Sequence, residues 1–237
     1  RVQSICVAYE GMEKFFPADK IVMTGNPIRS IIVPATPEMK EEGVKEYGLD
    51  PLRKHIFIVG GSLGSARFNQ CMKKWITDGC PGIDGVDVLW QCGKHYKPDI
   101  DKFMDEQRAK NPDVVRHIHH SDFIGRMDLA YAAADVVVSR SGASSVSELC
   151  AARKAVIFIP SPNVAEDHQT HNAMALVRKD AAVVVKDSEA MEKMIPTALE
   201  LLKDPARIAT LEENAGKMAL PDAAEKIAEE VYKLVKG

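Results

Sequence analysis

The sequence lacks three features that would place it in other classes of protein. No apolar run approaches the length of about 20 residues that spans a bilayer. The five cysteines are scattered without a CxxC pair, which predicts reduced thiols in a cytosolic protein, with Cys71 and Cys150 buried in helices. The net charge of −3 argues against broad binding to a nucleic-acid backbone, which needs clustered Lys and Arg, but leaves room for a small anionic ligand.

Targeting signals and repeats are absent as well. The sequence starts at Arg1 without an initiator methionine or a signal or transit composition, so we expect a piece of a longer protein. We find no repeat of solenoid period and no low-complexity tract. With 46% hydrophobic and 27% charged residues over 237 positions, the composition is that of a soluble globular chain with one large or two small domains.

Buried strands and helices alternate along most of the chain. This alternation predicts an α/β fold with a Rossmann-like, doubly wound parallel sheet. Two further short strands, at 4–8 and 20–24, are too little to fold alone, and the break at Gly25-Asn26-Pro27 predicts a hinge or domain boundary. The strands expected in the sheet are 56–59, 86–90, 114–118, 136–138, 155–159 and 182–185, and the helices are 66–76, 99–110, 126–134, one from about 146, one from 166–168, 189–203, 205–218 and 221–236.

Two of these strands end in polar turns that open helices. The run Val136–Val138 stops at Ser139, and residues 140–145 are small and rich in hydroxyls, so backbone N–H groups can approach an anion closely. The strand at 155–159 leads into a loop at 160–163 and a helix that carries Gln169 and Asn172. Ligands collect at such carboxyl ends of an open parallel sheet, so we expect the functional site there.

The turn at residues 60–65, GGSLGS, has the glycine content of a phosphate-binding loop. A dinucleotide site also needs an acidic residue at the end of the second strand, where this sequence has Gln91. A Walker A loop is excluded, because Ser65 and Ala66 follow Gly64 in place of Lys and Ser or Thr. Two interpretations stay open: a turn that binds phosphate through Ser62 and the helix N-terminus, or a purely structural tight turn.

Other motifs have structural explanations of equal or greater weight. Ser145 to Glu148 matches a capping box, in which the glutamate binds its own helix start. Asp99-Ile100-Asp101 resembles a metal-binding DxD, but its place after Pro98 favours a helix N-cap.

The three histidines at 117, 119 and 120 lack the partners of a zinc site, and we predict no metal or cofactor. Phe123 and Ile124 are apolar loop residues that would pack in a core by default, or form a wall for a base.

Four motifs in this order resemble the carboxyl-terminal half of the MurG family. They are Asn26-Pro27-Ile28-Arg29, the turn from Gly60 to Asn69, the segment from Arg140 to Glu148, and Asp167-His168-Gln169 with Asn172. MurG enzymes transfer N-acetylglucosamine (GlcNAc) from UDP-GlcNAc to undecaprenyl-pyrophosphoryl-MurNAc-pentapeptide (lipid I) and form lipid II for peptidoglycan. The resemblance implies the donor-binding carboxyl-terminal domain of a two-domain GT-B glycosyltransferase that inverts the anomeric centre without a metal.

The resemblance also assigns roles to single positions. Arg29 and Ser62 would contact the donor diphosphate, which suits an anion. Ala143, Ser144 and Ser145 would form the turn beside it. The remaining assignments are Phe123 covering the uracil, the Ile124 backbone reading its edge, Glu148 holding the ribose hydroxyls, and His168 and Gln169 contacting the sugar.

The resemblance implies a division of the chain as well. Residues 1–27 would end the acceptor domain and form the hinge, 28–218 the donor domain, and 219–237 a closing helix that packs back on the first domain. Lipid I, the membrane at the inner face of the bacterial plasma membrane, and the catalytic base would all belong to the missing amino-terminal domain. Two alternatives stay open: a related lipid glycosyltransferase with a diacylglycerol acceptor, and a non-catalytic nucleotide-binding module.

Overall fold

Six short strands, most of them rich in Val, Ile and Phe, build one parallel sheet. The computed structural model describes residues 2–9, 11–162 and 167–236. In its main sheet the strand order is β5-β4-β3-β6-β7-β8, and all neighbours are parallel. The strands are β3 (Lys54–Val59), β4 (Val86–Gln91), β5 (Ile118–Ser121), β6 (Val136–Ser139), β7 (Val156–Phe158) and β8 (Val183–Val184).

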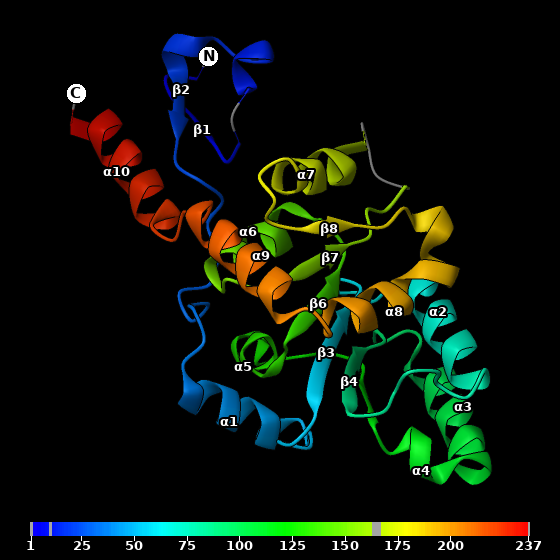
Figure 1. Cartoon of the computed structure of the whole chain (residues 1–237). Coiled ribbons are helices and arrows are strands. Elements are labelled where there is room, and N and C mark those ends of the chain that lie inside the picture. The colour runs from blue at the N-terminus through cyan, green and yellow to red at the C-terminus, as the bar shows by residue number, and fades with distance from the viewer. Residues whose placement is uncertain (1, 10, 163–166, 237) are drawn as a thin grey trace.

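This order confirms the predicted doubly wound sheet. The chain runs outward from β3 through β4 to β5, returns to β6 beside β3, and then runs outward the other way (Figure 1). The reversal leaves a crevice at the carboxyl ends of β3 and β6, which is where open sheets of this kind bind ligands.

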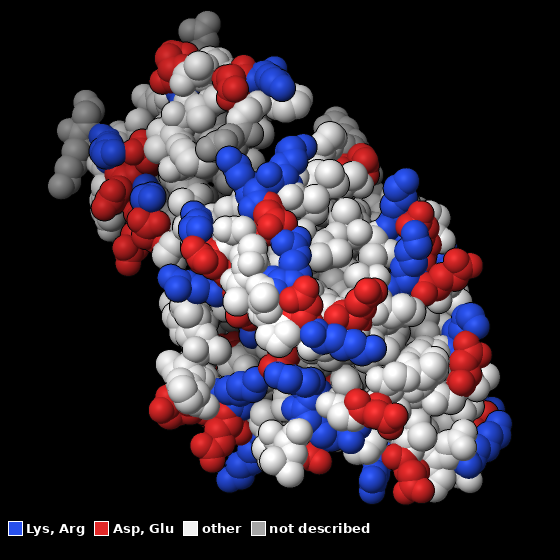
Figure 2. Space-filling view, viewed as in Figure 1, with Lys and Arg blue, Asp and Glu red and all other residues white. Residues whose placement is uncertain are grey.

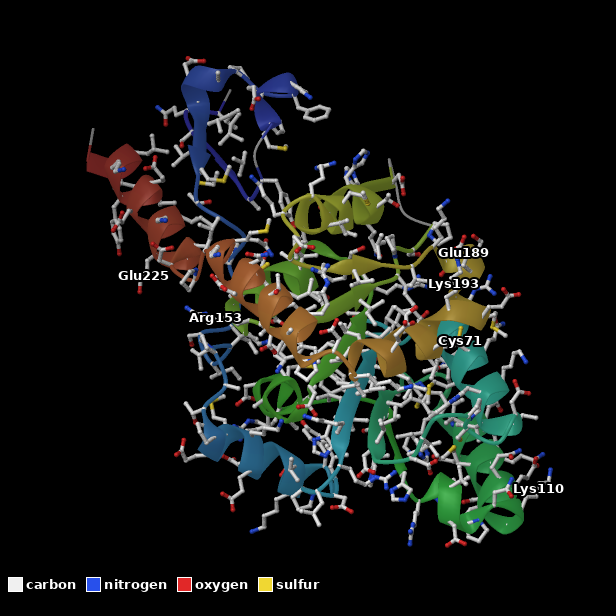
Figure 3. All side chains as sticks on the ribbon, in the orientation of Figure 1. Cys71, Lys110, Arg153, Glu189, Lys193 and Glu225 are labelled. Carbon is white, nitrogen blue, oxygen red and sulfur yellow. The ribbon has the colours of Figure 1, made fainter. Side chains whose placement is uncertain are left out.

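Helices cover both faces of the sheet (Figure 1). One apolar cluster packs α2 and α8 against one face, and a second packs α5 and α6 against the other. Cys71 and Cys150 are buried in these clusters as predicted. Cys71, on α2, contacts α8, with its Sγ 3.6 Å from Met191 Sδ (Figure 3). The helices are α1 (Pro37–Glu46), α2 (Ala66–Thr77), α3 (Lys97–Lys110), α4 (Pro112–Val115), α5 (Met127–Ala133), α6 (Ala143–Ala151), α7 (His168–Val177), α8 (Ala190–Leu201), α9 (Pro205–Lys217) and α10 (Ala223–Lys236).

Two predicted boundaries are wrong. The strand expected at 114–118 begins only at Ile118, because Pro112 starts the short helix α4 and proline is preorganised for a first helical position. The helix expected from Val146 begins at Ala143, so Ala143, Ser144 and Ser145 are its first turn and not a loop.

A second, two-stranded sheet stands apart from the first. In it β1 (Ile5–Val7) and β2 (Ile21–Met23) pair in parallel, close to the two predicted short strands. Helix α10 runs from the main sheet toward this small sheet (Figure 1), and Ser4 Oγ donates to Glu230 Oε2 over 3.3 Å.

The distribution of surface charge and the character of the helices are relevant to binding of nucleic acid and to insertion in a membrane. Lys and Arg are interspersed with Asp and Glu on the face shown in Figure 2. Within the described ranges, no helix combines the length and the apolar character needed to cross a membrane.

Candidate functional site

The glycine turn after β3 is held so tightly that its glycines are required. Gly64 has φ +79°, and a Cβ there would collide with the backbone carbonyl of Cys92. A Cβ on Gly60 would lie 2.5 Å from the Ser65 nitrogen. Ser65 caps α2 by accepting a hydrogen bond from Phe68 N at 3.3 Å, and Ser62 lies exposed in the turn.

The turn after β6 opens α6 in the way an anion site requires. Gly142 is the N-cap residue, with extended backbone (φ −63°, ψ 151°) and no side-chain hydrogen bond to the helix start. The first backbone N–H groups of an α-helix have no intrahelical acceptor. The N-terminus of α6 therefore presents donors and the positive end of a helix dipole at the carboxyl edge of the sheet.

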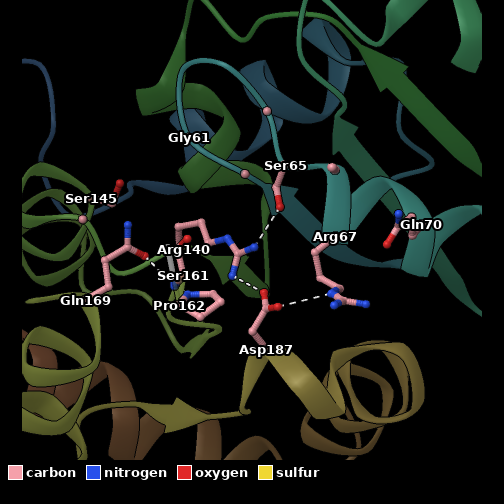
Figure 4. Close-up of a pocket in the computed structure, with 14 residues that line it drawn as sticks. Gly61, Ser65, Arg67, Gln70, Arg140, Ser145, Ser161, Pro162, Gln169 and Asp187 are labelled. Carbon is pink, nitrogen blue, oxygen red and sulfur yellow. Dashed lines mark hydrogen bonds and ion pairs between the residues drawn. The ribbon is translucent and has the colours of Figure 1, made fainter. Parts of the chain in front are cut away.

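A pocket of about 530 Å³ lies between these two turns. It occupies the crevice at the point where the strand order reverses. Its wall continues to Ser161 and Pro162, after β7, and to Asp187, after β8 (Figure 4). The lining residues are Gly60, Gly61, Gly64, Ser65, Ala66, Arg67, Gln70, Arg140, Gly142, Ser145, Ser161, Pro162, Gln169 and Asp187.

Arg140 links the walls of the pocket. Its guanidinium donates to Asp187 Oδ1 at 2.6 Å, to the Ile159 carbonyl at 2.8 Å and to Ser65 Oγ at 3.0 Å. Asp187, in the short 3-10 helix η4 (Asp187–Glu189), also accepts from Arg67 Nε at 3.2 Å (Figure 4). Two guanidinium groups against one carboxylate leave this wall with a net positive charge, which suits an anionic ligand.

Gln169 joins the far side of the pocket to the turn after β6. Its side-chain oxygen accepts from Ser161 N at 2.9 Å, and its backbone carbonyl accepts from Ser141 Oγ at 2.7 Å. Asn172 donates to the Ser141 carbonyl at 3.0 Å. Gln169 therefore ties the loop after β7 through its side chain and the turn after β6 through its backbone. Its side-chain amide, which also carries N–H donors, lines the pocket.

Glu148 does not form the expected capping box. Because α6 begins at Ala143, Ser145 lies inside the first turn and cannot be the N-cap. The Glu148 carboxylate instead pairs with Arg29, whose Nε and Nη2 lie 3.0 and 2.9 Å from Oε1 and whose Nη2 lies 3.0 Å from Oε2. Tyr131 Oη donates to Oε2 over 3.3 Å. Two residues predicted to bind one ligand thus meet each other directly, although 119 positions separate them.

Phe123 and Ile124 have opposite environments at the end of β5. The Phe123 side chain is 60% exposed, which contradicts core packing, whereas Ile124 is 3% exposed and packs in the second apolar cluster. Behind them Gln91 donates to the Asp122 carbonyl at 3.1 Å and accepts from Gly60 N at 3.3 Å. These bonds tie the end of β5 to the glycine turn.

The predicted site residues therefore occupy one edge of the sheet but not one cavity. Ser145 and Gln169 line the pocket, and Ser62 lies in the same turn as Gly61. Arg29, Glu148, Phe123 and Ile124 lie outside its lining, and His168 is the exposed first residue of α7. The predicted loop residue Asn163 and the helix entry at Glu166 fall outside the described residues.

Sequence reasoning missed part of the positive wall. Arg67 and Gln70 share one face of α2 directly after the glycine turn, and their spacing of three residues was a usable signal. Nothing local marked Asp187 or showed that Arg140 would bridge to it across 47 positions.

The DxD and histidine motifs serve other purposes. Helix α3 begins at Lys97, so Asp99 lies in its first turn and is not the predicted N-cap. Asp101 pairs with Lys97 at 2.7 Å and with His120 Nε2 at 2.7 Å. Lys97 and His120 also hold the pKa of Asp101 below its ordinary value. Among the described residues we find no grouping of three or more His, Cys, Asp or Glu suited to a metal ion.

An open parallel sheet with a pocket at the point where the strand order reverses places this chain in the Rossmann-like class of α/β folds. The pattern of the glycosyltransferase family 28 C-terminal domain matches residues 55–227. The chain belongs to this glycosyltransferase family.

Relatives and solved structures agree with that assignment. The UDP-N-acetylglucosamine--N-acetylmuramyl-(pentapeptide) pyrophosphoryl-undecaprenol N-acetylglucosamine transferase of Parabacteroides distasonis is 48% identical over 99% of this chain and 61% of its own length. The enzyme of the same name from Flavobacterium psychrophilum is 44% identical over 100% and 61%. The chain thus spans about three fifths of the length of these relatives.

Two solved structures share the fold. The MurG structure from Acinetobacter baumannii has a TM-score of 0.67 at 24% identity and covers 98% of this chain and 60% of that one. An Anabaena HepE structure in complex with UDP and glucose has a TM-score of 0.63 at 13% identity and covers 97% and 63%. These likenesses agree with the predicted fold, the carboxyl-terminal domain of a GT-B glycosyltransferase.

Proposed function

We propose that this chain is the UDP-GlcNAc-binding part of the glycosyltransferase that adds GlcNAc to lipid I to make lipid II. The observation that carries the proposal is the pocket between the glycine turn and the N-terminus of α6, with its positive wall of Arg67 and Arg140. A diphosphate matches such a set of donors. The names of relatives 44–48% identical supply the sugar nucleotide and the acceptor.

The sheet edge suggests an order for the parts of the donor. The exposed Phe123 after β5 would cover the uracil and the Ile124 backbone would read its edge, while Glu148 would hold the ribose. Ser62, Arg29 and the first turn of α6, from Ala143 through Ser144 to Ser145, would bind the diphosphate. His168 and Gln169 would contact the sugar at the far end. The chemistry this supports is stabilisation of a leaving UDP by helix N–H groups and guanidinium.

Acceptor binding and catalysis belong, in this proposal, to a preceding domain. Residues 1–27, with β1 and β2, would end that domain, 28–218 would form the donor domain, and 219–237 would pack back on the first domain, as the contact of Ser4 with Glu230 suggests. Attachment to the inner face of the plasma membrane would come through the same preceding domain.

Calorimetric titration with UDP-GlcNAc, UDP and NADH tests the proposal. We expect the two uridine nucleotides to bind and NADH to fail, since β4 ends in Gln91 and not in a ribose-binding carboxylate. Arg29→Ala should weaken UDP binding, whereas the matched change Arg108→Ala on the exposed face of α3 should not. Tighter binding of NADH than of UDP would refute the donor assignment.

A transfer assay tests whether this chain binds the donor while the preceding domain supplies acceptor binding and the catalytic base. Holding an acceptor in line with the anomeric carbon can supply about 7 to 11 kcal/mol of barrier reduction, and a general base about 10²- to 10⁴-fold more. We place both on the preceding domain, so the 237-residue chain should bind donor and leave a soluble lipid I analogue unglycosylated. Robust GlcNAc incorporation would place the catalytic group within these residues.

A further inference from the structure

Among the described residues, two neighbours of different character form hydrogen bonds with the carboxylate of Glu148. Its side chain is 11% exposed, and a carboxylate that far from water needs donors to remain favourable. Arg29 supplies three short contacts from one side, and Tyr131 supplies one hydroxyl from the other. The two neighbours respond differently to a ligand.

Arg29 is the exchangeable neighbour. It lies in the segment between β2 and α1, and its side chain is 45% exposed even while paired with Glu148. A guanidinium has five donors, so it can turn some of them toward a diphosphate that carries more charge than one carboxylate. In the proposed function Arg29 contacts this diphosphate, and its hold on Glu148 then weakens when the donor binds.

Tyr131 is the fixed neighbour. The residue is 2% exposed on α5, and its ring packs edge-on against Phe57 with centroids 6.0 Å apart. Burial, and then the neighbouring Glu148, raise the pKa of Tyr131 far above its ordinary value, so the hydroxyl keeps its proton as a donor. Its 3.3 Å bond to Oε2 is the longest contact on the carboxylate while Arg29 is in place.

A fixed donor matters because the last torsion of a glutamate side chain is soft. This sp³–sp² torsion has broad minima, whereas two neighbouring ribose hydroxyls must meet both carboxylate oxygens in one plane. A donor held in the core on Oε2 restricts this rotation. Once Arg29 turns to the diphosphate, the remaining lone pairs of both oxygens are free to accept.

We propose that Tyr131 is a positioning residue for the ribose subsite: its buried hydroxyl orients the Glu148 carboxylate to accept the vicinal ribose hydroxyls while Arg29 engages the diphosphate. This inference rests on the proposed function and deepens it. Tyr131 touches no substrate and acts through Glu148.

The test compares UDP with 2′,3′-dideoxyuridine 5′-diphosphate, which lacks both ribose hydroxyls. We would titrate both into the 237-residue chain, Tyr131→Phe, Glu148→Gln and Tyr47→Phe, and record the melting temperature of each. Tyr47→Phe is the matched control, because its hydroxyl donates to the Arg126 carbonyl at 2.8 Å and not to Glu148.

The ratio of the two affinities isolates the ribose contact. We expect Tyr131→Phe to reduce the preference for UDP about three- to tenfold, the span of one hydrogen bond, with Glu148→Gln reducing it further and Tyr47→Phe leaving it unchanged. A merely structural role would lower the melting temperature and leave the ratio intact.

Two results would overturn the inference, and they differ from failure of the proposed function. A wild-type ratio in Tyr131→Phe with a reduced ratio in Glu148→Gln would remove Tyr131 alone. A wild-type ratio in both variants would remove the ribose role of Glu148 and the inference with it. Absence of UDP binding to the wild-type chain would refute the proposed function itself.

Discussion

Charged side chains gather both at the amino ends of the strands of the main sheet, called here the amino edge, and at their carboxyl ends, the carboxyl edge. Their surroundings differ at the two edges. At the amino edge Asp87, 2% exposed, accepts from Asp50 N at 2.8 Å and pairs with Arg53 at 2.6 Å and His117 at 2.9 Å. At the carboxyl edge Asp187 is also held by cations, but there Arg67, Arg140 and the two glycine-bearing turns surround a cavity of about 530 Å³.

In this comparison, a cluster of charges does not by itself distinguish the candidate site from the rest of the sheet. At the amino edge the charged side chains pair with one another and with backbone groups. Arg53, for example, also donates to the carbonyls of Ile83 and Val86. The carboxyl edge adds small residues and a helix N-terminus, which keep space and backbone donors available. We therefore expect changes at the amino edge to alter stability and changes at the carboxyl edge to alter ligand affinity.

The largest effect should come from Asp87→Asn. Removing one partner of a buried ion pair leaves Arg53 with an uncompensated charge and costs about 3 to 5 kcal/mol of unfolding free energy. Urea unfolding measures this loss, and UDP affinity of the folded fraction should be unchanged. Asp78→Asn, which breaks an exposed pair with Lys74, is the control and should cost less than about 1 kcal/mol. Equal losses in the two variants would contradict the comparison.

Gly64→Ala should lower both the stability of the fold and the affinity for UDP. Gly79→Ala is the control that separates the two effects. Gly64 and Gly79 have φ of +79° and +84°, but a Cβ at Gly79 meets nothing within 4 Å, whereas one at Gly64 meets the Cys92 carbonyl. A left-handed alanine costs on the order of 1 kcal/mol or more, so both variants lose stability. Only Gly64→Ala must shift the turn and should weaken UDP at least about tenfold, which is about 1.4 kcal/mol. Unaltered affinity in Gly64→Ala would exclude this turn from the site.

A smaller effect is expected from pH at the amino edge. His119 faces Asp87, His117 and His55, and burial holds its pKa below the ordinary 6.5. Below about pH 6.5 the unfolded chain therefore binds a proton that the folded chain does not, and stability falls with acidification by at most about 1.4 kcal/mol per pH unit. Urea unfolding between pH 7.5 and about 5.5 should show a shallower decline for His119→Gln than for wild type. His95 is exposed, so His95→Gln should keep the wild-type slope of stability against pH. If the His119→Gln slope also equals the wild-type slope, His119 is not the source of the decline.

The sequence predicts what is local in this fold. Runs such as Ile56–Val59 and Val136–Val138 are buried strands, and the turns that follow them are at the predicted edge. Errors arose where two local signals compete. The β-branched pair Val114 and Val115 favours a strand, but Pro112 starts a helix first; and hydroxyl-rich residues after Gly142 favour a loop, but the helix already begins at Ala143.

The position of the candidate site at the carboxyl ends of the strands could be predicted from the sequence, but the contacts between its residues could not. Ser145 and Gln169 were expected at the pocket and line it. The pairing of Arg29 with Glu148 and of Arg140 with Asp187 joins segments whose approach depends on the packing of the whole sheet. Spacing within the sequence contains no information on such contacts. The capping-box interpretation of Glu148 fails for a local reason, because α6 begins at Ala143 and Gly142 is its N-cap.

Amide hydrogen exchange with and without UDP tests the comparison most directly. The account predicts slower exchange at the glycine turn from Gly60 to Ser65 and at the start of α6 around Ala143 to Ser145, with unchanged exchange around Arg53, Asp87 and His117. Backbone amides report the contact itself and need no variant. Protection at the amino edge, or unchanged exchange at both turns in the presence of saturating UDP, would contradict the assignment of the carboxyl edge as the nucleotide site.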